Sequence, residues 1–112
     1  MTAVPPDHLV VLVTAGSGEE AATIARTLVE ERLAACVNVV GPIRSIYRWQ
    51  DAVEEAAEHL LIVKARGTDL PTLEARVRAL HSYAVPEVLA LPVTGGSREY
   101  LTWLDGATAR RR

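Results

Sequence analysis

The sequence of 112 residues contains no phenylalanine, one cysteine, one methionine and one lysine. A single cysteine, Cys36, excludes an intrachain disulfide framework and cannot build a thiolate zinc site by itself. No hydrophobic run approaches the roughly 18 residues that a membrane span needs, and the first residues lack the basic flank and apolar core of a signal peptide. We therefore expect a cytoplasmic protein with no membrane association.

A strong charge of either sign is also missing. Twelve basic residues against fourteen acidic residues give a formal net charge of −2. A dedicated nucleic-acid binder would carry a marked basic excess, so we expect no nucleic-acid partner. The hydrophobic content of 49% excludes a disordered chain. The length fits one domain over residues 1–112, with flexible ends expected at 1–7 and 106–112.

Apolar periodicity divides the chain into four strands and three helices. The strands are predicted over residues 9–13, 36–49, 52–65 and 88–93, with an interruption at Gly41-Pro42 inside the second. The helices are predicted over residues 18–34 and 70–80, with a short last helix after Ser97. Alanine and glutamate at 52–59 favour a helix by propensity, but the strand-like run 60–63 follows without a stop signal. We therefore predict that residues 52–65 form the return strand of a hairpin.

This order, β-α-β-β-α-β with a short terminal helix, predicts an α+β ferredoxin-like split βαβ sandwich. Two main helices cover only one face of a four-stranded sheet. The strands nevertheless carry apolar residues at both parities, as in residues 9–13 and 60–63. The uncovered face therefore needs a partner, and we expect the chain to self-associate.

The densest polar patch of the second half combines His81, Ser82 and Tyr83 with Pro86 and Glu87. A histidine at a helix end is commonly stabilised by the helix dipole. Imidazole is also a metal ligand and a proton carrier near neutral pH, so both interpretations of the patch stay open.

Tyr47 and Trp49 share one face of the predicted hairpin with Ser45, because side chains alternate along a strand. Buried together they would anchor an interface, which we favour; exposed together they would form a ligand platform. Lys64 is either a strand-end charge or an amine with a tunable pKa. No serine-histidine-aspartate order, HExxH motif or paired-acid motif is present, so we expect no enzymatic activity.

Five segments together resemble the CutA family, the divalent-cation tolerance proteins. They are Leu-Ala-Ala-Cys-Val-Asn at 33–38, Ser-Ile-Tyr-Arg-Trp at 45–49, Glu58 six places before Lys64, His81-x-Tyr83-x-x-Pro86-Glu87, and Tyr-Leu-x-Trp-Leu at 100–104. Their order and spacing match over nearly the whole chain. The resemblance implies a ferredoxin-like homotrimer in which long hairpin arms cross between neighbours, an architecture shared with the PII signalling trimers.

The resemblance also implies tolerance to divalent metals, copper above all, and copper binding. Of the metal-ligand set proposed for the family only His81 remains, and we expect Glu87 or Glu58 to help it bind the ion. The cleft or interface positions that the resemblance indicates are Asn38, Ser45, Tyr47, Trp49, Lys64, Tyr83 and Trp103. The sequence departs from the family at three proposed metal-ligand positions, which are Val13, Leu80 and Ala84 here.

Three functions follow. The first is a trimer whose inter-subunit clefts bind Cu(II) or another divalent cation weakly. The second is a PII-like sensor of a small anionic metabolite, with Lys64, Arg48 and Tyr83 as its contacts. The third is a structural trimer that acts through a protein partner. The sign of the charge that gathers in the cleft distinguishes the first function from the second.

Overall fold

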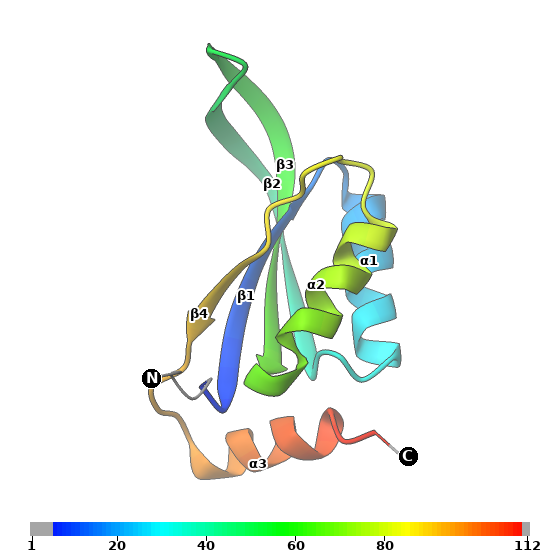
Figure 1. The fold of residues 1–112 in the computed structure, drawn as a ribbon, viewed down its shortest axis with the longest axis vertical. Coiled ribbons are helices and arrows are strands. Elements are labelled where there is room, and N and C mark those ends of the chain that lie inside the picture. The colour runs from blue at the N-terminus through cyan, green and yellow to red at the C-terminus, as the bar shows by residue number, and fades with distance from the viewer. Residues whose placement is uncertain (1–5, 111–112) are drawn as a thin grey trace.

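The computed structural model describes residues 6–110 (Figure 1). Its elements are β1 (His8–Ala15), α1 (Gly18–Glu30), β2 (Cys36–Trp49), β3 (Ala52–Arg66), a 3₁₀ turn (Gly67–Asp69), α2 (Leu70–Leu80), β4 (Leu89–Pro92) and α3 (Arg98–Ala107). The predicted α+β class and the order of the elements are confirmed. The long strand predicted at 52–65 is also confirmed, against its local helix propensity.

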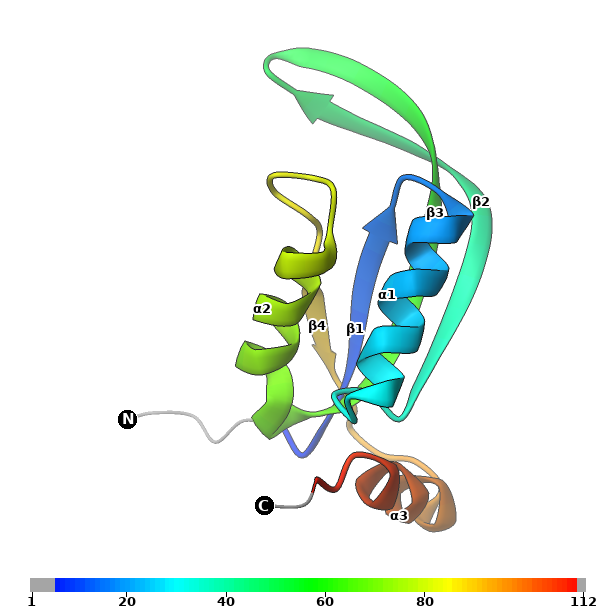
Figure 2. The same ribbon diagram turned by 90° about the vertical axis from the view of Figure 1, so that its right-hand side faces the viewer.

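The four strands form one antiparallel sheet in the order β2-β3-β1-β4. Helices α1 and α2 lie next to each other on one face of the sheet, and α3 lies across one end of it (Figure 2). Alternate residues of β1 face the two helices and are buried, namely Leu9, Val11, Val13 and Ala15. The core therefore lies between one sheet face and two helices.

The opposite sheet face is apolar but largely uncovered in a single chain. Val10 and Leu12 of β1 are half-buried there. Their partners across the β1–β4 ladder, Leu91 and Leu89, are exposed. Strand β1 is central in the sheet, as predicted, but only one of its faces is fully buried by its own chain.

Helix α1 ends at Glu30, earlier than the predicted end at residue 34. The backbone of Arg32 adopts a left-handed conformation with φ of 60°. The amides of Leu33 and Ala34 then donate to the Leu28 carbonyl at 2.9 and 3.1 Å. This turn buries both side chains without extending the helix, because a left-handed residue breaks the helical hydrogen-bond pattern.

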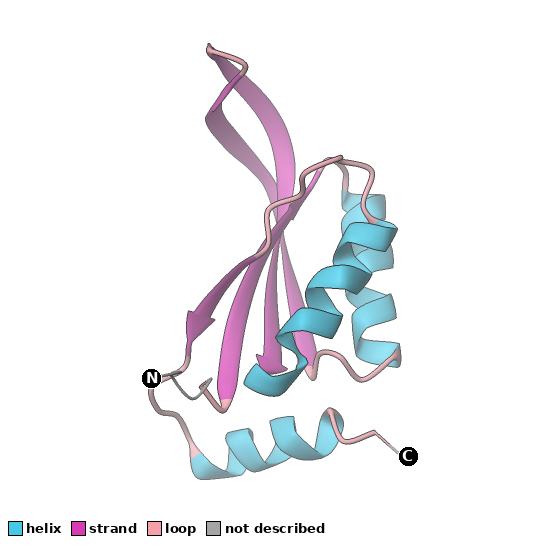
Figure 3. Cartoon of the chain, viewed as in Figure 1, coloured by secondary structure: helices cyan, strands magenta, loops and turns pink. Residues whose placement is uncertain are grey.

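Strands β2 and β3 continue beyond the sheet as a two-stranded arm (Figure 3). The pairing register shifts between Val40 and Ile43, where the sequence predicts an interruption at Gly41. A two-residue turn closes the arm at Gln50 and Asp51, both with positive φ. This geometry matches the right-handed twist of a hairpin.

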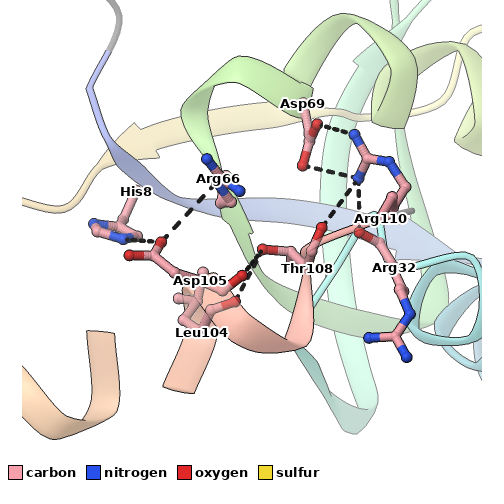
Figure 4. A network of polar contacts seen from close by, with 8 residues as sticks. All are labelled: His8, Arg32, Arg66, Asp69, Leu104, Asp105, Thr108 and Arg110. Carbon is pink, nitrogen blue, oxygen red and sulfur yellow. Dashed lines mark hydrogen bonds and ion pairs between the residues drawn. The ribbon is translucent and has the colours of Figure 1, made fainter. Parts of the chain in front are cut away.

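The C-terminal part of the chain is fastened to the body by charged contacts (Figure 4). Asp69, with 6% of its surface exposed, forms an ion pair with Arg110. Arg110 Nη1 also donates to the Arg32 carbonyl at 2.9 Å. Asp105 of α3 lies 2.8 Å from His8 Nε2. These contacts attach the end of α3 and Arg110 to the body of the domain. The flexible ends expected at 1–7 and 106–112 stay a prediction, and residues 1–5 and 111–112 lie outside the described residues.

Candidate functional site

A cleft of about 680 Å³ lies between the hairpin arm and the loop at 81–88 that connects α2 to β4. The arm curves over this loop in Figure 2. Six residues predicted from the sequence contribute to the cleft wall: Ser45, Tyr47, Trp49, Glu58, Tyr83 and Glu87. Alternation along β2 aligns the first three on one face of the arm, as predicted.

A hydrogen bond joins the two sides of the cleft. Tyr83 in the loop donates its hydroxyl to Glu58 Oε2 on β3 at 2.8 Å. The Glu58 residue is only 7% exposed, so its carboxylate is an unusually buried charge for a surface cleft. Burial, together with the bond to Glu58, raises the pKa of Tyr83 to about 12. Tyr83 therefore stays protonated and acts as a donor at neutral pH.

The charge that gathers in the cleft is negative. Burial raises the pKa of Glu87, and the nearby charge of Glu58 raises it further. Arg44 is the basic residue of the wall among residues 6–110. Its side chain is 75% exposed, and its Nε lies 3.8 Å from Glu55. Two carboxylates thus face the cleft, while the neighbouring arginine is largely in solvent.

His81 lies behind the cleft wall with both ring nitrogens engaged. Nε2 lies 2.7 Å from the Thr14 carbonyl, and Nδ1 accepts a hydrogen bond from the Tyr83 amide at 3.0 Å. A carbonyl can only accept and an amide can only donate, so these contacts fix the neutral tautomer with the proton on Nε2. The ring centroid also lies 4.7 Å from that of Tyr83, with the two ring planes tilted by 49°. In this arrangement His81 orients Tyr83 and offers no free lone pair to a metal.

Glu20 of α1 holds the same loop in place. Its Oε2 accepts from the Ser82 amide at 2.9 Å, and its Oε1 accepts from the Gly16 amide at 3.4 Å. Burial acts to raise the pKa of Glu20, but the bonds from Ser82 and Gly16 outweigh it and the pKa is lowered. Ser82 is 62 residues from Glu20 in the sequence, so no local pattern signals this contact.

Three predicted cleft or interface residues lie elsewhere. Lys64 lies opposite Cys36, toward the other end of β3. Asn38 is exposed on β2, with its Oδ1 4.0 Å from the Cys36 Sγ. Trp103 is on α3, with its ring 5.4 Å from that of Tyr100. None of the three lines the cleft.

Within residues 6–110, no group of three or more histidine, cysteine, aspartate or glutamate side chains is arranged to hold a metal ion. Of the three positions where the sequence departs from the family, Val13 is buried in the core and Ala84 lines the cleft. The carboxylates that line this cleft are those of Glu58 and Glu87. No helix among the described residues is long and apolar enough to cross a membrane.

Comparison with known proteins gives a consistent result. The family model described as CutA1 divalent ion tolerance protein matches residues 9–107. The divalent-cation tolerance protein CutA of Thermus thermophilus is 59% identical over 95 residues, which are 85% of this chain and 92% of that protein. The chloroplastic CutA protein of Arabidopsis thaliana is 48% identical over 100 residues, 89% of this chain but only 55% of that protein.

Solved structures agree with these sequence matches. The Thermus thermophilus protein has a TM-score of 0.89 at 56% identity, covering 91% of this chain and 99% of that chain. The protein described as periplasmic CutA from Archaeoglobus fulgidus has a TM-score of 0.89 at 40% identity, with the same two coverages. Both descriptions name tolerance to divalent cations. The chain belongs to the CutA1 divalent ion tolerance protein family.

Proposed function

We propose that this divalent-cation tolerance protein assembles as a homotrimer and binds a divalent cation weakly in its cleft, through Glu58 and Glu87. The convergence of these two carboxylates carries the proposal. Burial and the charge of Glu58 both raise the pKa of Glu87. A bound cation would lower the pKa of Glu87, because it stabilises the ionised form of each carboxylate.

The donor set argues for weak binding. Carboxylates are hard oxygen ligands that suit many divalent ions, and two of them leave most of a coordination shell to water or to a neighbouring subunit. Copper prefers imidazole, but His81 joins the shell only if it gives up its bond to Thr14 or to Tyr83. The contacts of His81 therefore support the two glutamates as the principal ligands.

The uncovered sheet face supports self-association. It presents Val10, Leu12, Leu89 and Leu91, which water would otherwise solvate. The projecting arm is long enough to reach beyond its own sheet, as the proposed crossing of arms between neighbours requires (Figure 1).

The alternative functions receive less support. A sensor of an anionic metabolite would need Lys64 and Arg48 in the cleft, and neither residue lines it. A structural trimer that acts through a protein partner needs a separate surface that binds this partner. No contact within residues 6–110 indicates such a surface. The cytoplasmic location stays a prediction, since relatives are described as periplasmic and as chloroplastic.

Calorimetric titration of metal-free protein with Cu²⁺ and with Mn²⁺ at neutral pH tests the site. We expect weak, reversible binding that Glu87→Gln reduces for both ions, while Glu74→Gln, on α2 and paired with Arg78, leaves it unchanged. Loss of copper binding in His81→Ala, with full binding in Glu87→Gln, would move the site to the histidine. Light scattering tests the assembly, and a monomer mass at micromolar concentration would contradict the trimer.

A further inference from the structure

The loop at 81–88 is attached to the junction between β1 and α1 by two hydrogen bonds. One joins His81 Nε2 to the Thr14 carbonyl, as described above. The other runs from the Ser82 amide to Glu20 Oε2, at 2.9 Å. Both partners belong to the junction, since Thr14 lies near the end of β1 and Glu20 lies in the first turn of α1. The first residues of the loop are therefore fixed at one place on the body of the domain.

Glu20 holds the junction together as well as the loop. Its Oε1 accepts from the Gly16 amide at 3.4 Å, while its Oε2 accepts from Ser82. The backbone amide of Glu20 donates to Ser17 Oγ at 3.1 Å, so the start of the helix is capped independently of the carboxylate. The side chain is therefore free to bridge two segments that are 62 residues apart in the sequence.

A further contact between the junction and the loop involves Tyr83. A Cβ atom at position 16 would lie 3.1 Å from the Tyr83 hydroxyl oxygen, a tighter contact than a Cβ atom normally makes. The hydroxyl thus lies against the backbone of Gly16 and donates from there to Glu58. How well it reaches Glu58 depends on how closely the loop is held to the junction.

These contacts all lie within one chain. A neighbouring subunit that packs against the hairpin arm would add contacts without replacing the hydrogen bonds of Glu20 to the two backbone amides. The attachment of the loop therefore does not depend on which surfaces the assembly covers.

A residue that orients a metal ligand affects affinity although it does not touch the ion. Tyr83 occupies Oε2 of Glu58 and leaves Oε1 to accept another partner. Loss of such an orienting bond typically costs about 10–100-fold in metal affinity. Glu87 belongs to the same loop, so the spacing of the two carboxylates also depends on where the loop is held.

We propose that Glu20 is a positioning residue of the metal site. Its carboxylate does not bind the ion but holds the loop at 81–88 against the β1–α1 junction. The held loop lets Tyr83 orient Glu58 and keeps Glu87 at the same cleft. The effect on metal affinity rests on the proposed function, whereas the effect on the bond between Tyr83 and Glu58 does not.

Titration of the metal-free assembly with Mn²⁺, followed by the electron paramagnetic resonance signal of the free ion, tests the effect on affinity. Glu20→Ala keeps the amide bond to Ser17 but removes both carboxylate bonds, and it should weaken binding about tenfold. Glu20→Gln loses the charge but keeps an oxygen that can accept from Ser82, so its affinity should stay closer to that of the wild type. Glu31→Ala removes a carboxylate that pairs with Arg76 at the other end of α1, and this control should leave affinity unchanged.

A double-mutant cycle with Tyr83→Phe tests the positioning without any metal. Tyr83→Phe should destabilise the wild type more than it destabilises Glu20→Ala, because the bond to Glu58 is already weakened when the loop is released. Denaturant unfolding of the four proteins at a fixed protomer concentration measures the difference. The same cycle with Glu31→Ala should be additive, since Glu31 has no contact with the loop among its hydrogen bonds to Arg76.

Additive effects of Glu20→Ala and Tyr83→Phe would overturn the positioning role. Wild-type metal affinity in Glu20→Ala would also overturn it, and so would an equal loss in Glu31→Ala. An equal loss in Glu20→Gln would mean that the charge of Glu20 acts on the ion from a distance, which contradicts positioning. Absence of Mn²⁺ binding by the wild type would overturn the proposed function, and the double-mutant cycle would then decide the role of Glu20 by itself.

Discussion

The hydroxyl of Tyr83 lies 2.8 Å from Glu58 Oε2 and donates to it across the cleft. The contact connects the loop after α2 with the hairpin arm, two segments that are 25 residues apart in the sequence. It also gives a donor to a carboxylate that is only 7% exposed. The shape of the cleft therefore depends on this pair.

Replacing Tyr83 by phenylalanine should destabilise the protein. The substitution keeps the ring but leaves the buried Glu58 carboxylate without this donor, which costs about 1–3 kcal/mol of unfolding free energy. Denaturant unfolding at a fixed protomer concentration measures the change. Tyr100→Phe, on the exposed surface of α3, serves as the control and should stay within about 0.5 kcal/mol of the wild type. Equal stability of the two variants would contradict the role assigned to Tyr83.

The contribution of the Tyr83 hydroxyl should disappear at alkaline pH. Its pKa in the folded protein is about 12, raised by burial and by Glu58, against about 10 in an unfolded chain. A raised pKa means that the stabilisation is fully present below pH of about 10 and is lost as the pH rises toward 12. The stability difference between wild type and Tyr83→Phe should therefore shrink over this range. Tyrosinate absorbance should show one tyrosine that titrates late in the wild type and is absent from the variant.

The sequence predicts the hairpin and the order of elements because these depend on local pattern. Alternation at 43–49 and the run at 60–63 specify the strands, and Gly41 marks the register shift. The end of α1 was missed because Arg32, rather than a glycine or asparagine, adopts the left-handed conformation there. Nothing in an arginine side chain signals that backbone geometry.

The candidate site was predictable as a set of residues but not as a geometry. The polar patch at 81–87 gave Tyr83 and Glu87 as candidates, and the family resemblance added Glu58. The fold brings the three to one cleft. The state of His81 was not predictable, because one of its partners is the backbone carbonyl of Thr14, 67 residues away. A carbonyl partner has no signature in the sequence, since every residue carries one.

Replacing Glu87 by glutamine should stabilise the metal-free protein at neutral pH. Burial and the charge of Glu58 raise its pKa, so the ionised form is disfavoured in the folded state. A carboxyl group whose pKa is raised by folding stabilises the folded protein at a pH below its pKa in the unfolded chain. This stabilisation is lost as the pH rises through its pKa in the folded protein. The gain from Glu87→Gln should therefore appear at neutral pH and vanish below about pH 4, near the ordinary glutamate pKa. Thermal unfolding at both pH values, with chelator present, measures it; a loss of stability at neutral pH would show that the charge of Glu87 is favourable.

Replacing Arg110 by methionine should weaken the attachment of the C-terminal part. The guanidinium pairs with Asp69, which is 6% exposed, and also donates to the carbonyl of Arg32. A buried carboxylate left without its partner costs about 1–3 kcal/mol. Arg78→Met breaks the exposed pair with Glu74 and should cost less than about 1 kcal/mol, as surface pairs do. Unfolding free energies of the two variants decide the matter, and equal losses would mean that the Asp69 pair is no more than a surface contact.

Replacing Gly41 by alanine should destabilise the base of the hairpin arm, whereas the same change at Gly106 should not. A Cβ atom at position 41 would come too close to the His59 ring for a normal contact, 2.4 Å from its Cδ2. The ring has little room to move aside, because its Nδ1 is buried. Forcing a methyl group into such a site typically costs about 1–3 kcal/mol.

Gly106 provides the matched control, because a Cβ atom there meets no atom within 4 Å and the residue lies in the last turn of α3. Alanine in a helix is favoured over glycine by roughly 0.5–1 kcal/mol, so Gly106→Ala should raise the melting temperature. The double variant Gly41→Ala/His59→Ala removes the ring and should recover much of the stability lost by Gly41→Ala, relative to His59→Ala alone. Thermal unfolding of these variants measures the coupling between the two positions. An additive result would show that His59 is not what confines position 41 to glycine.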